Sequence, residues 1–290
     1  MTVHPFIEAE KRAGHSVKRA CELLKVSRAA HYHRRTAAPS PRAVRDAEPT
    51  ERITQAHRAS RGSYGAPRIH AVLVRGGARV GRRRTARPMR RAGLAGRHRR
   101  RGHRTTVADP HAANRPDLVG RDFTPGPSVS GARWCGDITY LATEQGQLFP
   151  ATVIDIATRK VVGRATADHL RTSLVADALR DAVRRRRPQR GTIFHSDRGC
   201  QYTSRGLAVL AGEFGIRLSV GRTGQCWDNA LAESFFAILK SDLGADRPRP
   251  TRAAAHAEVF EWIEGRYNIR RLHSSLGYRT PVEYEAALAA

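Results

Sequence analysis

Three acidic residues occupy positions that a role in solubility does not explain. Asp137 falls inside a predicted strand over Trp134–Leu141, and aspartate fits a half-buried pleated surface poorly. Asp197 directly follows an apolar strand, and Glu233 lies on the polar stripe of a helix that begins at about residue 228. Carboxylates gathered within a few ångströms repel one another unless a cation neutralises them. The three acids therefore predict either one shared cation site or separate ion pairs with the many arginines of the chain.

The donor chemistry of these acids indicates Mg²⁺ or Mn²⁺. Carboxylate oxygens are hard ligands, and no Cys or His with metal-ligand spacing accompanies them. Two such ions about 3.5–4 Å apart are the usual apparatus for in-line phosphoryl displacement. The four cysteines, Cys21, Cys135, Cys200 and Cys226, form no CxxC pair, which favours reduced thiols over a disulfide framework or a zinc site.

The sequence pattern after about residue 121 predicts an α/β domain, whose strands and helices must position the acids. Three closely spaced strands predict an antiparallel meander, and alternating helices and strands follow, so we expect a mixed sheet with helices on both faces. Pro150, in the second strand, is expected to cost a ladder hydrogen bond. The expected strands are 134–141, 148–156, 160–165, 192–195 and 216–220, and the expected helices are 172–185, 205–214, 228 onward and 252–267.

The charge of the chain points to a polyanionic partner. Its 290 residues contain 52 Lys+Arg and 26 Asp+Glu, a formal charge of +26, and 28 of the basic but only 8 of the acidic residues lie before residue 121. Arg52–Ala108 holds 17 arginines and no acid, which an ordinary solvated surface does not require. No apolar run approaches the roughly 18 residues of a membrane helix, and the N-terminus lacks a signal-peptide pattern, so we expect a cytoplasmic, nucleoid-associated protein.

Residues 16–35 predict a first basic helical module. Two short helices around a tight connection fit a helix-turn-helix, with Ser27 capping a second helix that presents Arg28, His31, Arg34 and Arg35 to a DNA groove. An ordinary helical hairpin is the alternative. Residues 36–43 are expected to form a linker.

Residues 46–95 predict a second basic module. Thr50 is expected to cap a helix that ends near Ala59, and Pro67 suits the first turn of the next one. A third helix would carry Arg82, Arg83 and Arg84, with Pro88 breaking or kinking it. Residues 96–122 lack periodicity and are expected to form a basic connector.

Five blocks of the sequence resemble the DDE transposases of the insertion-sequence-3 family, relatives of retroviral integrases. Asp197 and Glu233 are separated by 35 residues, which is the spacing of that family. The blocks are WCGDITY (134–140), VIDIATRKVVG (153–163), HSDRGCQYTS (195–204), DNALAESFFAILK (228–240) and YNIRRLHSSLGYRTPVEYE (267–285).

The resemblance implies a fold and a reaction. The fold is a ribonuclease-H-like core over 123–290, with a mixed five-stranded sheet, preceded by helix-turn-helix-like modules at 1–38 and 46–95. The chain would be the catalytic downstream frame of a mobile element, cleaving DNA to free a 3′-hydroxyl and joining that end to another strand. Two Mg²⁺ or Mn²⁺ ions would be bound by Asp137, Asp197 and Glu233. Lys240 would contact the element's end, with Asn229 as a neighbouring polar group.

The same resemblance implies partners. These are double-stranded DNA, as terminal repeats and as target, further copies of this chain on that DNA, and an upstream-frame protein of the same element. Three alternatives stay open. The chain is a non-catalytic sequence-specific DNA-binding protein, a degenerate inactive transposase copy, or a nuclease for RNA–DNA hybrids.

Several residues near the blocks have less definite interpretations. His195 is expected to orient Asp197 rather than to act as a base. Asp155 is expected to serve the turn at Thr158-Arg159. The group Tyr267, Asn268, Arg271 and His273 either touches DNA or caps the fold.

Overall fold

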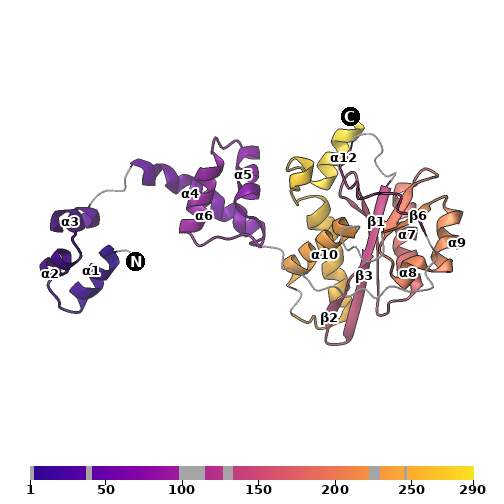
Figure 1. The fold of residues 1–290 in the computed structure, drawn as a ribbon, viewed down its shortest axis with the longest axis horizontal. Helices are drawn as coiled ribbons and strands as arrows, with labels where there is room; N and C mark the ends of the chain where they lie inside the picture. Colours follow the sequence, from indigo (N-terminus) through magenta and orange to yellow (C-terminus); the bar gives the residue numbers. More distant parts are fainter. Residues whose placement is uncertain (1–2, 37–40, 98–114, 127–132, 222–228, 245–246) are drawn as a thin grey trace.

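The computed structural model describes residues 3–36, 41–97, 115–126, 133–221, 229–244 and 247–290, and the side chains of 34–49 lie outside that description. Figure 1 shows two groups of helices along the long axis, followed by a sheet that has helices on both sides. None of the described helices combines the length and apolarity that crossing a membrane requires.

The first group has three helices, α1 (Val3–Arg12), α2 (Val17–Leu23) and α3 (Arg28–Thr36). The last two confirm the predicted pair, and Ser27 Oγ accepts a 3.4 Å hydrogen bond from Ala30 N–H at the start of α3. The sequence prediction missed α1. It was also wrong about His31, which is buried rather than presented to a groove. The His31 ring stacks on His4 at 5.7 Å, and its Nε2 lies 3.1 Å from the Glu8 carboxylate.

The second group comprises α4 (Pro41–Ala59), α5 (Ala66–Arg75) and α6 (Arg82–Arg91). Thr50 does not cap α4, because the helix already begins at Pro41, and this also shortens the predicted linker of 36–43. Pro67 lies in the first turn of α5 as predicted.

The predicted break of α6 at Pro88 does not occur. The helix continues through it to Arg91. Thr85, Pro88 and Met89 are the buried residues of this helix, and Met89 joins the apolar core of the group. We infer that this packing offsets the roughly 3 kcal/mol that an interior proline costs.

The sheet is mixed, as predicted. β1 runs antiparallel to β3 and parallel to β5, β4 pairs antiparallel with β3, and β6 runs parallel to β5. Six strands are described where five were expected, because β1 and β2 pair with different stretches of β3 and replace one predicted strand. The strands are β1 (Arg133–Ile138), β2 (Leu141–Thr143), β3 (Gly146–Asp155), β4 (Val161–Ala167), β5 (Ile193–Ser196) and β6 (Arg217–Val220).

Pro150 fits a central strand because of the gap between β1 and β2. Its carbonyl oxygen accepts a 3.0 Å hydrogen bond from Thr139 N–H, just beyond the end of β1. In an antiparallel pair the N–H and C=O of a residue point to the same neighbour, so the missing N–H faces that gap. No ladder bond to β4 is lost.

Helices cover both faces of the sheet (Figure 1). One face packs on α7 (Thr172–Arg186), α8 (Cys200–Thr203) and α9 (Arg205–Glu213), with Trp134 and Phe194 in its core. The other packs on α10 (Ala230–Leu243) and α11 (Arg252–Glu261). A π-helical stretch (Trp262–Asn268), a short 3-10 turn (Ser274–Leu276) and α12 (Pro281–Ala289) complete the chain.

The end of the predicted connector belongs to the core. Arg115 donates to the carbonyls of Tyr202, Thr203 and Ser204, and Val119 is buried against the α10 face. The connector prediction of 96–122 is therefore wrong for its last residues, while residues 98–114 lie outside the described part.

The second helical group is docked on the C-terminal segment. Tyr64 Oη accepts a 2.9 Å hydrogen bond from Leu272 N–H and donates to Arg270 O at 3.3 Å. Leu272 is buried in the core of α4–α6. Arg75 also pairs with Glu283.

Candidate active site

Asp137 is held at the end of β1. It is the penultimate residue of the strand, pairs with Thr152 of β3, and accepts a 2.8 Å hydrogen bond on Oδ1 from Ile138 N–H. Gly136 before it leaves no room for a side chain, because a Cβ there would lie 2.5 Å from the Phe194 ring. The predicted strand reached Leu141, so Asp137 lies nearer to a strand end than expected.

Asp197 directly follows β5, as predicted. Because β5 is parallel to β1 and adjacent to it, Asp137 and Asp197 occur at the same edge of the sheet, where α/β proteins place ligand-binding groups. The Oδ1 atom of Asp197 accepts a 3.0 Å hydrogen bond from Gly199 N–H.

Glu233 comes from the first turn of α10 and is half-buried. The start of this helix is tied to β1, since Asn229 Nδ2 donates to Gly136 O at 3.3 Å. Asn229 is buried, and its Oδ1 has no hydrogen-bond partner among the described residues. The Asn229 contact thus holds the Glu233 helix beside the Asp137 strand.

The pKa of Asp137 responds to the charges of the other two acids. Burial raises the pKa of Asp137 well above its usual value, and the charges of Asp197 and Glu233 raise it further. Burial also raises the pKa of Asp197, although the Gly199 N–H and the charge of His195 oppose the change. Asp137 therefore lies within electrostatic range of both other acids. A shared cation site for the three acids stays a prediction.

Lys240 faces the same group from the far end of α10. Burial lowers the pKa of Lys240, while the charge of Asp137 opposes that change. The Lys240 Nζ lies 4.0 Å from the centre of the exposed Tyr140 ring, a cation–π contact. A cation is thereby held within electrostatic range of Asp137.

His195 is buried at the end of β5. Its Nδ1 lies 2.8 Å from Ser219 Oγ and 3.9 Å from Asp117 Oδ1. Its charge lowers the pKa of Asp197. The role of orienting Asp197 stays a prediction. Tyr202, which sequence reasoning missed, is also buried here, and Asp137 and Asp197 both raise its pKa.

The donor set suits a hard divalent cation, because it consists of carboxylate oxygens. Among the described residues, no three His, Cys, Asp or Glu side chains are close enough together to hold a metal ion as they stand. Cys21, Cys135 and Cys200 are free thiols, as expected, and Cys226 falls outside the described part.

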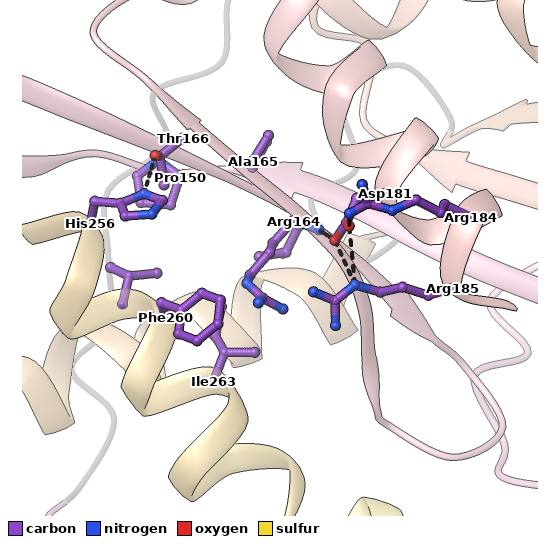
Figure 2. A pocket seen from close by; sticks show the side chains of 13 residues that line it. Pro150, Arg164, Ala165, Thr166, Asp181, Arg184, Arg185, His256, Phe260 and Ile263 are labelled. Carbon is purple, nitrogen blue, oxygen red and sulfur yellow. Dashed lines mark hydrogen bonds and ion pairs between the residues drawn. The ribbon is translucent and has the colours of Figure 1, made fainter. Parts of the chain in front are cut away.

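A cavity of about 220 Å³ adjoins β3 and β4, apart from the acids. Figure 2 shows His256 and Phe260 of α11 facing Thr166 and Arg164 of β4 across it. The polar side chains there are already engaged: His256 Nδ1 lies 2.7 Å from Thr166 Oγ1, and the Arg164 guanidinium stacks on Phe260 at 4.1 Å. Asp137, Asp197 and Glu233 do not line this cavity.

The predicted DNA-contacting arginines of the helical groups are exposed where they are described. Arg28 begins α3, and Arg82, Arg83 and Arg84 begin α6, all with exposed side chains. Arg34 lies in α3, but its side chain is outside the described part. The motif Tyr267, Asn268, Arg271 and His273 serves the fold at one position at least, because Asn268 bonds both backbone groups of Val161.

Family comparisons agree with this architecture. An integrase core domain matches residues 127–226, a second integrase core domain matches 214–281, and an HTH-like domain matches 44–102. Two solved structures are similar, with TM-scores of 0.45 and 0.41. The first is the simian T-cell lymphotropic virus intasome in complex with PP2A regulatory subunit B56 gamma, at 16% identity, covering 80% of this chain and 73% of that one. The second is the HTLV-2 integrase catalytic core domain with magnesium, at 14% identity, covering 54% and 97%.

Curated relatives extend over nearly the whole chain. The transposase for insertion sequence element IS904 of Lactococcus lactis subsp. lactis is 34% identical over 253 residues, covering 87% of this chain and 98% of that protein. Transposase InsF for insertion sequence IS3A of Escherichia coli K12 is 34% identical over 291 residues, covering 97% of each. The chain therefore belongs to the insertion-sequence-3 family of DNA transposases, as its sequence blocks suggested.

Proposed function

We propose that this transposase cleaves and joins DNA strands at the ends of its insertion sequence, using metal ions bound by Asp137, Asp197 and Glu233. The observation that carries the proposal is the position of Asp137 and Asp197 at the ends of adjacent parallel strands, with the first turn of α10, which holds Glu233, bonded to β1 through Asn229. Burial is the main cause of the raised pKa of Asp137, and the charges of Asp197 and Glu233 raise it further. A divalent cation relieves repulsion of this kind. We propose Mg²⁺ as the ion, with Mn²⁺ able to replace it, and two ions in each site.

The backbone prepares the two aspartates for this role. Ile138 N–H and Gly199 N–H each donate to the Oδ1 atom of one aspartate and so help to fix the orientation of its carboxylate. When bound, two ions activate the attacking oxygen and stabilise the leaving oxygen of a phosphodiester. Glu233 closes the set from α10, and Asn229 holds that helix to β1.

The substrate proposed is double-stranded DNA, both the terminal repeats of the element and the target. Lys240 would hold a phosphate beside the acids. Arg28, Arg34 and the cluster 82–84 would bind duplex away from them, since arginine neutralises phosphates without reading sequence. Several copies of the chain on one DNA, and an upstream-frame partner, belong to the same proposal.

The decisive experiment is a cleavage and joining assay on a labelled terminal-repeat duplex in Mg²⁺. Asp137→Asn, Asp197→Asn and Glu233→Gln should each abolish both reactions and leave DNA binding intact. Asp177→Asn is the matched control, because this exposed acid pairs only with Arg180 on α7 in the described structure. Its activity should equal that of the unaltered chain.

Two other outcomes would contradict the proposal. A non-catalytic DNA-binding protein shows no cleavage to lose, and a hybrid nuclease cuts RNA–DNA in preference to the terminal repeat. A second readout does not depend on activity: Mg²⁺ should raise the melting temperature of the unaltered chain more than that of Asp137→Asn, because ligand binding stabilises the folded state.

A further inference from the structure

A second cavity, of about 260 Å³, lies on the face of α10 opposite to Glu233. On an ideal helix Leu231 and Ile238 lie about 160° and about 140° around the axis from Glu233, and Ser234 lies about 100° from it. The turn between β3 and β4 and the segment after α11 complete the walls. The lining residues are Phe123, Arg159, Ala230, Leu231, Ser234, Phe235, Ile238, Tyr267, His273 and Ser275.

Arg159 supplies a buried cation to this cavity. Its side chain is only 9% exposed, one guanidinium nitrogen, Nη2, donates to Phe123 O, and the other, Nη1, has no hydrogen-bond partner among the described residues. No described acid forms an ion pair with it. The charge of Asp155 favours the charged form of Arg159 only from beyond ion-pair distance, against the cost of burial. A buried charge without a directly paired counter-ion is costly, so an anion in the cavity would improve its environment.

The backbone places Arg159 at some cost. Its φ of 62° lies in the left-handed region, which non-glycine residues seldom adopt. Asp155 holds the turn, because its Oδ1 accepts from Thr158 N–H at 2.9 Å and its carbonyl accepts from Arg159 N–H at 2.8 Å. The predicted turn role of Asp155 is thus confirmed. These two bonds fix the turn that holds Arg159 at the wall of the cavity.

His273 offers a second unsatisfied polar atom. Its Nε2 is buried without a hydrogen-bond partner among the described residues, and its ring meets the Tyr267 ring edge-on at 5.0 Å. Burial and the charges of Arg271, Arg68 and Arg159 lower its pKa to about 3, so the ring is neutral at physiological pH. It can therefore donate or accept one hydrogen bond without adding charge.

We propose that this cavity binds one unpaired nucleotide of the DNA substrate, with its phosphate on Arg159 Nη1 and its base against the apolar wall. The inference rests on the proposed function, which supplies DNA strands beside α10. A recessed guanidinium suits a single nucleotide better than the phosphate of an intact duplex. Apolar walls with Phe123 among them suit a base, since every base has a face that stacks on apolar or aromatic side chains. The bound nucleotide would lie about one helix diameter, roughly 10 Å, from the acids.

The test measures nucleotide binding without catalysis. The full chain carrying Asp137→Asn is titrated calorimetrically with deoxyadenosine monophosphate, without divalent cations, at high salt that screens exposed arginines. Arg159→Gln should weaken binding at least about tenfold, the size expected for one charge-assisted hydrogen bond. Ser234→Leu, which fills the cavity from α10, should do the same. Arg217→Gln, an exposed arginine of β6, should change binding less than about twofold.

Three results would overturn the inference. Arg217→Gln would weaken binding as much as Arg159→Gln, inorganic phosphate would bind as tightly as the nucleotide, or an acetylated Asp-Glu dipeptide would displace the nucleotide at equal concentration. If Arg159→Gln does not fold, the titration of Ser234→Leu decides between the same outcomes. Absence of DNA cleavage by the unaltered chain would refute the proposed function and leave this titration unaffected.

Discussion

Tyr64→Phe tests the contact that joins the second helical group to the catalytic core. The substitution keeps the ring in the α4–α6 core and removes only the hydroxyl. That hydroxyl accepts from Leu272 N–H at 2.9 Å and donates to Arg270 O at 3.3 Å. Leu272 is 5% exposed, so its N–H would lose its partner inside the protein.

The size of the effect follows from this burial. A buried donor without an acceptor costs about 1–3 kcal/mol, more than the net value of an ordinary hydrogen bond. The longer bond to Arg270 O adds little, because that carbonyl can find water or another donor. Each 1.4 kcal/mol is a factor of ten, so the docked state should open about 5 to 150 times more often.

Hydrogen exchange measures this opening at the affected amide itself. The peptide that contains Leu272 should exchange faster in Tyr64→Phe by that factor, while a peptide from the centre of β3 stays protected. Tyr140→Phe is the control, because Tyr140 is 53% exposed, and exchange at Leu272 should not change. Equal exchange in Tyr64→Phe and the unaltered chain would refute the docking argument.

Three further predictions concern packing and charge. Gly163→Ala should destabilise the core by about 1–3 kcal/mol in urea unfolding, because the added Cβ would lie 2.5 Å from a Cβ of α7. Gly212→Ala, which has open space around it in α9, should instead stabilise the core by about 0.5–1 kcal/mol. Equal effects of the two substitutions would contradict the packing argument. Arg75 lowers the pKa of Glu283 to about 2, so the stability that this ion pair contributes is present above pH about 4.3 and is lost as the pH falls toward 2. The free energy of unfolding of Arg75→Ala, measured over the same pH range, should lack this part of the acid-induced decrease. The raised pKa of Asp137 makes stability depend on pH in the opposite direction. Without divalent cations, the melting temperature of the unaltered chain should fall as the pH rises above about 4, and that of Asp137→Asn should fall less. Identical pH profiles of the two proteins would contradict the repulsion at the buried carboxylate.

Much of the α/β core could be predicted from the sequence. The strand and helix ranges follow from apolar periodicity, which depends on residues close together in the chain. β5 ends at Ser196, one residue beyond the predicted strand, and α10 begins two residues after the predicted start. The metal-binding roles of the three acids stay predictions, since the electrostatic coupling concerns Asp137 with each of the other two.

Other features could not be predicted, because their partners are distant in sequence. The break between β1 and β2 depends on Pro150 of another strand. The failure of Pro88 to end α6 depends on the packing of the helical group. The Nη1 atom of Arg159 is left without a hydrogen-bond partner among the described residues only because the turn, α10 and the C-terminal segment surround it. Local pattern carries no information on any of these contacts.

The Leu272 contact also bears on how the protein is made. Leu272 is part of the core of the α4–α6 group, which is synthesised before it, and its hydrogen-bond partner Tyr64 lies 208 residues earlier in the chain. At about 5–20 residues per second, a ribosome needs roughly 10 to 40 s to cover that distance. The basic helices therefore emerge with an apolar gap that only the last part of the polypeptide can fill, and a prematurely terminated chain would expose that gap permanently.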